Sequence, residues 1–162
     1  MSKERESQIG SLLLRYKPRR CVEVGVETGA GTLFMAGIVK DWGGHVLAVD
    51  CWDNGEMFKT FIANLADSQL QGYVSFMRSP SVAAARAYVP YADFVYVDAD
   101  HSFESVLADL KAWYPHVRPS GGVLAGDDYA MEGVHAAWNE FADREGLQLD
   151  KENQVVWTVR SQ

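Results

Sequence analysis

Short apolar segments alternate with amphipathic segments along this chain, and that order constrains the fold more than any other feature. Apolar runs at 21–26, 45–49, 73–77, 93–97 and 122–126 have the length and composition of buried strands. Helical patterns separate them, at 4–16, 31–40, 56–67, 81–87, 103–117 and 131–144. Because parallel strands need crossover connections, the alternation predicts an α/β fold. We expect a Rossmann-like, doubly wound, mostly parallel sheet covered on both faces.

The chain has 162 residues, and we expect it to form a single domain. Residues 1–17 would supply an N-terminal helix, and residues 20–130 the core of the fold. Residues 131–162 would add one helix and a C-terminal antiparallel hairpin, formed by 147–150 and 154–160.

Composition and charge exclude several classes of protein. The net charge of −7 argues against a nucleic-acid partner, because phosphate binding needs clustered Lys and Arg. The two cysteines lack zinc-site spacing, and no apolar run reaches the ~18 residues of a membrane span. We therefore expect no membrane partner and a cytoplasmic location.

A glycine-rich turn follows the first predicted strand. It reads Glu23-Val-Gly25-Val-Glu-Thr-Gly29-Ala-Gly31. Glycines allow close approach of the backbone to a ligand, and the next helix offers free N–H groups. A dinucleotide fold uses GxGxxG instead. This ExGxxxGxG pattern resembles the first motif of class I methyltransferases, whose loop holds the amino-acid part of S-adenosylmethionine. The alternative is a tight turn without a ligand.

The second and third strands also end in candidate cofactor residues. Asp50 follows the second strand, where an acid can accept hydrogen bonds from both ribose hydroxyls. Alternatively, Asp50 caps the segment that follows it. Ser81 follows the third strand, where related methyltransferases often have Gly-x-Ser with the serine against adenine. This chain has Ser-Pro-Ser, and Ser81 is equally suited to be a helix N-cap.

Acidic residues follow the fourth and fifth strands. Asp98 is followed three residues later by His101, and the fifth strand runs into Asp127 and Asp128. Adjacent strands would bring these carboxylates to one rim, where they repel one another unless a cation lies between them. Mg²⁺ or another hard divalent cation prefers such oxygen ligands. The alternative is that the acids cap helices or face solvent.

The run DFVYVDADHSFESVLADLKAWYPHVRPSGGVLAGDDY, residues 93–129, carries a more specific resemblance. It resembles metal-dependent O-methyltransferases of the macrocin O-methyltransferase type and their cephalosporin-hydroxylase-like relatives. More distantly, it is similar to catechol O-methyltransferases. The resemblance covers roughly residues 20–130. It implies Mg²⁺ ligands at Asp98, Asp127 and Asp128, and places Asp98 beside S-adenosylmethionine. The histidine at position 101 and the final Asp-Asp pair match the sugar-modifying type.

The predicted reaction is methyl transfer from S-adenosyl-L-methionine to a hydroxyl of a small molecule, either a glycoside or a phenol-like compound. His101 is the candidate base, because histidine titrates near neutral pH; alternatively, it only bonds backbone groups at a helix start. Two other functions are left open: a module that binds the cofactor without transfer, and a nicotinamide-dependent oxidoreductase. A homodimer is a possible assembly.

Overall fold

The computed structural model describes residues 2–88 and 90–158. They build one seven-stranded sheet in the order β3-β2-β1-β4-β5-β7-β6. Strands β1 to β5 are parallel, and β7 pairs antiparallel with both β5 and β6. The strands are β1 (Arg20–Val24), β2 (His45–Asp50), β3 (Val74–Arg78), β4 (Phe94–Val97), β5 (Val123–Gly126), β6 (Leu149–Glu152) and β7 (Val155–Thr158). The predicted doubly wound sheet with its C-terminal hairpin is confirmed.

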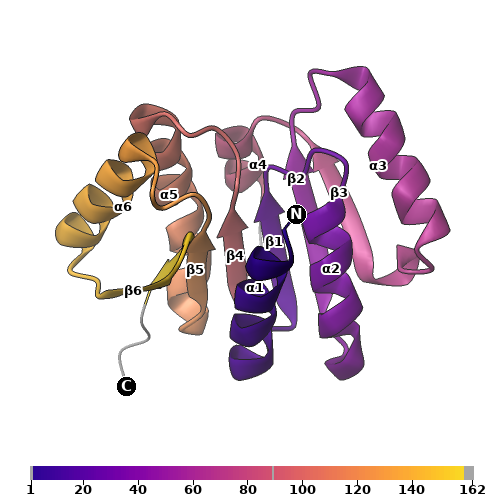
Figure 1. Cartoon of the computed structure of the whole chain (residues 1–162), viewed down its shortest axis with the longest axis horizontal. Coiled ribbons are helices and arrows are strands. Elements are labelled where there is room, and N and C mark those ends of the chain that lie inside the picture. The colour runs from indigo at the N-terminus through magenta and orange to yellow at the C-terminus, as the bar shows by residue number, and fades with distance from the viewer. Residues whose placement is uncertain (1, 89, 159–162) are drawn as a thin grey trace.

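Helices cover both faces of the sheet (Figure 1). Three of them pack on one face: α1 (Lys3–Tyr16), α2 (Ala30–Val39) and α3 (Gly55–Asp67). The opposite face carries α4 (Ser81–Ala87), α5 (Phe103–Val117) and α6 (Glu132–Glu145). Short 3-10 turns lie at Lys40–Trp42, Gln71–Tyr73 and Arg118–Ser120.

Alternating side chains of the strands divide the core into two layers. In β4, Phe94 and Tyr96 pack under α1 and α2, whereas Val95 and Val97 pack under α5 and α6. All four are buried, as expected for a central strand covered on both faces. Packing on both faces fixes where β4 ends, and the next residue, Asp98, lies at the rim of the sheet.

The order of the strands reverses between β1 and β4, which are neighbours in the sheet but far apart in sequence. In open α/β sheets, a ligand binds outside the carboxyl ends of the strands at such a point. Figure 1 shows the N-terminal end of α1 beside the tips of these two strands. A ligand is therefore expected at the rim above β1 and β4.

Several boundaries differ from the expected ones by one or two residues. The first strand of the hairpin is Leu149–Glu152 rather than 147–150, because the chain turns at Asn153, which has a φ of 51°. The first strand ends at Val24 rather than at residue 26, because Gly25 has a φ of 87°, which ends the extended conformation. The final strand ends at Thr158; the predicted residues 159 and 160 lie outside the described residues. Among the helices of the described chain, none combines the length and the hydropathy that crossing a membrane requires.

Candidate functional site

Gly25 begins the loop after β1 and packs directly on the loop after β4. A Cβ atom at this position would overlap the carbonyl oxygen of Asp98, and the φ of 87° is itself unfavourable for other residues. The Gly25 amide donates to the carbonyl of Val49, which ties the same loop to β2. Gly25 therefore permits three strand ends to meet.

Glu23 and the next two glycines shape the start of α2. Gly29 is the N-cap, in a left-handed conformation, and no side-chain hydrogen bond caps this helix. Glu23 is buried, and its carboxyl accepts a hydrogen bond from the hydroxyl of Thr32. A Cβ at Gly31 would overlap the Glu23 carboxyl. Burial raises the pKa of Glu23 to about 8, although the hydrogen bond from Thr32 opposes the shift.

Asp50 holds the glycine-rich turn in place from the end of β2. Its Oδ2 accepts hydrogen bonds from the amides of Val26 at 2.8 Å and Glu27 at 3.0 Å. Its Oδ1 accepts one from the amide of Trp52 at 2.7 Å. This is the backbone-capping role that the sequence left open. Each carboxylate oxygen can accept further bonds, so the predicted role toward ribose stays a prediction.

Ser81 is the first residue of α4, and the N-cap position belongs to Pro80. The interpretation of Ser81 as an N-cap is therefore wrong, because its side chain is engaged elsewhere. Its Oγ accepts a hydrogen bond from the indole of Trp113 at 3.0 Å, and its hydroxyl donates to the carboxyl of the buried Asp109. Ser81 and Asp109 both line the cavity described next. The predicted adenine contact stays a prediction.

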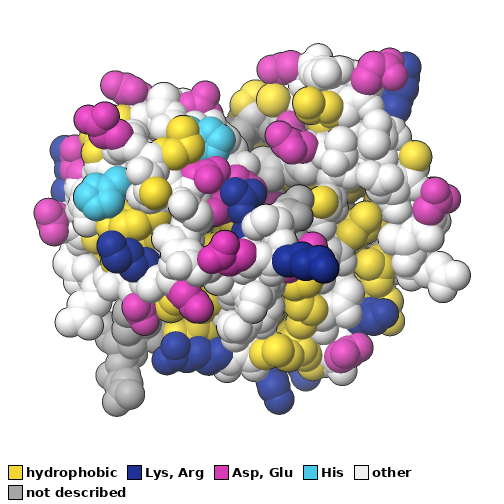
Figure 2. Space-filling model, viewed as in Figure 1, with side chains coloured by type: hydrophobic (Ala, Val, Ile, Leu, Met, Phe, Trp, Pro, Cys, Tyr) yellow, Lys and Arg dark blue, Asp and Glu magenta, His cyan; other side chains and the backbone are white. Residues whose placement is uncertain are grey.

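Two adjoining cavities form a groove along the carboxyl ends of the strands. The larger, about 620 Å³, runs past Asp50 to Ser81. The smaller, about 230 Å³, runs along the glycine-rich turn to His101 and Asp128. Both are lined by Gly25 and Asp98. Figure 2 shows the corresponding hollow between the two halves of the molecule, with charged side chains in and around it.

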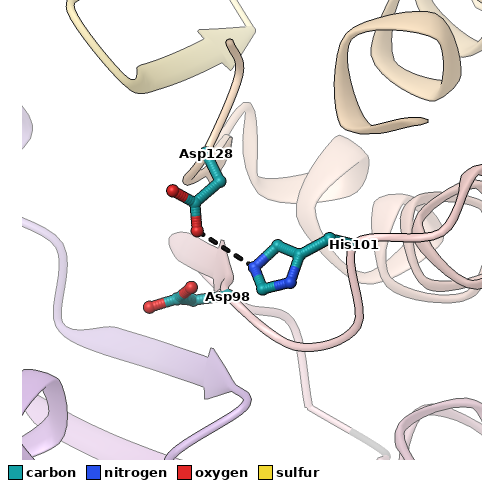
Figure 3. A group of neighbouring side chains, drawn as sticks. All are labelled: Asp98, His101 and Asp128. Atoms are coloured by element: carbon teal, nitrogen blue, oxygen red, sulfur yellow. Dashed lines mark ion pairs between the residues drawn. The ribbon is translucent and has the colours of Figure 1, made fainter. Parts of the chain in front are cut away.

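The acids predicted from the sequence gather at one end of this groove. Asp98, His101 and Asp128 each offer a ligand atom, and these atoms lie within 4.8 Å of one another. Figure 3 shows Asp98 and Asp128 arriving from different strands and His101 facing them. His101 Nε2 lies 3.0 Å from Asp128 Oδ2. Asp128 has a φ of 53°, which bends the chain toward the groove after β5.

Asp127 lies beside this trio, although it is outside the set of atoms within 4.8 Å. Its side chain is only 1% exposed, and its Oδ1 accepts the amide of Asp128 at 2.7 Å. Burial raises the pKa of Asp127. Burial, and next the negative charge of Asp127, raise the pKa of Asp98 to about 6. The three predicted carboxylates are thus brought to one rim.

Arg5, which the sequence analysis did not single out, contacts all three carboxylates. Its Nη1 lies 3.4 Å from Asp98 Oδ2 and its Nη2 lies 3.4 Å from Asp128 Oδ1. Its Nε forms an ion pair with Asp127 Oδ2. Arg5 lies on the same face of α1 as the buried Ile9 and Leu12. The sequence did carry a signal for this contact. Arg5 precedes the apolar Ile9 and Leu12 by four and seven residues, the spacing that places it on the buried face of the helix.

A donor set of carboxylates and one imidazole at a strand rim fits a hard divalent cation by its chemistry. In addition, the groove beside it has room for a nucleoside next to a loop with uncapped helix amides. The groove therefore has room for a cofactor beside carboxylates whose oxygens suit a cation, and in this structure Arg5 contacts those carboxylates. It could also support proton transfer, because His101 faces the same groove.

Residues 22–129 match the family model described as "Methyltransferase domain". The match covers two thirds of the chain and includes the glycine-rich turn and the acidic cluster. The chain belongs to this family. The matched segment includes most of β1, all of β2 to β5 and most of the residues that line the groove.

Curated proteins and solved structures also resemble this chain. A rhamnosyl O-methyltransferase of Mycobacterium leprae is 27% identical over 135 residues, covering 75% of this chain and 53% of that protein. An uncharacterized protein of Sinorhizobium fredii is also 27% identical, covering 82% of this chain and 16% of that protein. The chain thus spans about half or less of the length of these relatives. The O-methyltransferase of Bacillus cereus, solved in complex with SAH, has a TM-score of 0.79 at 16% identity, covering 98% of this chain and 82% of that one. This last similarity shows the fold.

Proposed function

We propose that this methyltransferase domain transfers a methyl group from S-adenosylmethionine to a hydroxyl of a small molecule. One observation carries the proposal: a single groove has the glycine-rich turn and Asp50 on one side and the acidic cluster with His101 at its end. The relatives that are O-methyltransferases support the acceptor atom. A glycoside or a phenol-like compound is the proposed acceptor class, and the protein is proposed to act in the cytoplasm.

We propose separate tasks for the residues along the groove. Asp50 would bind the ribose while its backbone bonds keep the glycine-rich turn rigid. The amides at the start of α2 and the turn itself would hold the amino-acid part of the cofactor. Ser81 lines the far end of the groove, and we propose that it contacts adenine. Alignment of the acceptor oxygen, methyl carbon and sulfur is then set by the groove, where effective molarities can reach ~10⁵ M.

Proton removal is assigned to His101. If Nε2–H donates to Asp128, the lone pair of Nδ1 is left to accept a proton. The acceptor oxygen forms a bond to the methyl carbon, the bond from carbon to sulfur breaks, and the hydroxyl proton passes to His101. We propose Asp98, Asp127 and Asp128 as holders of Mg²⁺ or a similar cation, which would lower the pKa of the hydroxyl when bound.

Calorimetry with S-adenosylmethionine, followed by mass spectrometry of candidate acceptors, tests this function. We expect cofactor binding and the gain of one methyl mass by a hydroxylated acceptor. Binding without transfer to any glycoside or catechol would favour the module that only binds the cofactor. Binding of a nicotinamide dinucleotide in place of S-adenosylmethionine would contradict the proposal. Sedimentation of the purified chain tests the proposed homodimer.

A further inference from the structure

The guanidinium of Arg5 already places a positive charge in the cluster in which a cation is proposed. One planar group reaches Asp98, Asp127 and Asp128 from the first turn of α1. Arginine suits this task, because its five N–H donors form a rigid fork that can bond several carboxylates at once. Burial alone lowers the pKa of Arg5, but the charges of Asp127 and Asp98 outweigh it, so the group stays charged.

A divalent cation cannot join this arrangement without changing it. Mg²⁺ requires oxygens at about 2.0–2.1 Å in octahedral geometry. Arg5 contacts one oxygen of each carboxylate, namely Oδ2 of Asp98, Oδ2 of Asp127 and Oδ1 of Asp128, whereas the other oxygen of Asp128 faces His101. Moreover, two positive charges at such short separation repel strongly, and the effect is greatest where water is excluded.

The position of Arg5 on α1 allows it to leave without unfolding the helix. Its side chain is 26% exposed, so it borders solvent, whereas Ile9 and Leu13 are fully buried and hold α1 on the sheet. The N-cap Ser2 accepts the Arg5 amide through its hydroxyl, which keeps the first turn closed. A cation in the first turn is disfavoured by the helix dipole. The ion pairs with the three carboxylates therefore hold the Arg5 side chain in place.

We propose that Arg5 and a divalent cation exclude each other from the acidic cluster, so that Arg5 holds the carboxylates together until the cation displaces it. The inference rests on the proposed cation site and adds a residue that regulates it. Before the cation arrives, the charge of Arg5 reduces the repulsion among the three acids. When the cation binds, the side chain of Arg5 swings into the open part of the groove while α1 stays docked.

Titration with Mn²⁺, without cofactor or acceptor, tests the exclusion. We expect Arg5→Ala to bind Mn²⁺ about tenfold or more tightly than the wild-type chain, within the usual range of coupling between two sites. Lys3→Ala is the matched control, because Lys3 is an exposed cation in the same turn. It should leave the affinity nearly unchanged. Arg5→Lys, which keeps one charge, should lie between the wild type and Arg5→Ala.

Equal or weaker Mn²⁺ binding by Arg5→Ala would overturn the exclusion, and so would absence of binding to every variant. Nuclear magnetic resonance gives an independent measurement on the wild-type chain. The Nε–H resonance of Arg5, assigned from its loss in Arg5→Lys, should shift toward that of a solvated arginine when Mg²⁺ is added. A resonance that stays unchanged at saturating Mg²⁺ would contradict displacement. Methyl transfer is not measured here, so failure of this inference is distinct from failure of the proposed function.

Discussion

The imidazole of His101 and the carboxylate of Asp128 meet across the groove, with Nε2 3.0 Å from Oδ2. His101 comes from the loop between β4 and α5, and Asp128 from the loop after β5. The pairing orients the ring toward the same cavity that the glycine-rich turn lines. The role of this ring as a base can be tested by replacing it.

Replacing His101 should reduce turnover without affecting binding of the cofactor. On an acceptor that the wild-type chain methylates, we expect His101→Ala to lower kcat by about 10²–10⁴-fold, the usual contribution of a general base. His45→Ala is the control, because His45 begins β2 at the opposite end of the sheet and bonds Ser75. Unchanged turnover in His101→Ala would remove this residue as the base.

Asp50 should matter for both cofactor affinity and stability. Asp50→Ala removes the acceptor of three backbone amides, each bond being worth about 1 kcal/mol. We expect weaker binding of S-adenosylhomocysteine in calorimetry and a lower free energy of unfolding in urea. Asp41→Ala, at an exposed position, should change neither. An unaltered affinity in Asp50→Ala would show that ribose recognition lies elsewhere.

Gly25 and Gly37 should respond in opposite ways to the same substitution. Gly25→Ala places a Cβ against the backbone of Asp98 at a φ of 87°, so we expect a loss of about 2–4 kcal/mol in unfolding free energy. Gly37 lies in α2 with nothing within 4 Å of its added Cβ. Gly37→Ala should therefore stabilise the chain by about 0.5–1 kcal/mol. Urea unfolding compares them, and equal effects would contradict the close approach at Gly25.

Glu23 should make stability depend on pH in a definite direction. Burial raises its pKa to about 8 in the folded chain, against an ordinary value of 4.5. Between these values the folded state keeps a proton that the unfolded state releases, so the stabilising effect of this proton is lost as pH rises. The unfolding free energy of the wild type minus that of Glu23→Gln should therefore decrease as pH rises. The slope is at most about 1.4 kcal/mol per pH unit.

The measurement is urea unfolding of both proteins at about pH 5, 6, 7 and 8, with the slope set by proton linkage. Glu4→Gln serves as the control, because Glu4 is exposed on the first turn of α1. A difference that does not change with pH for Glu23→Gln would show that the Glu23 carboxyl is ionised in the folded chain.

Much of the fold was predictable because its signals are local. The apolar stripe of α5 and the buried runs of β1, β2 and β4 each lie within one short window of sequence. Asp98, Asp127 and Asp128 were predictable for the same reason, since strand ends in a parallel sheet share one edge. The Ser81 N-cap was mispredicted because Trp113, thirty-two residues away, engages the hydroxyl.

The order of the elements, the doubly wound sheet and the rim on which the acids lie follow from the periodicity of the sequence and from the rules of parallel connection. The groups that these acids face depend instead on contacts between distant segments of the folded chain. Arg5 is ninety-three residues from Asp98 in the sequence. A local pattern does not predict which strand end the first turn of a helix contacts. That contact depends on how α1 docks on the sheet, which is set by the packing of Ile9 and Leu13 against the assembled core.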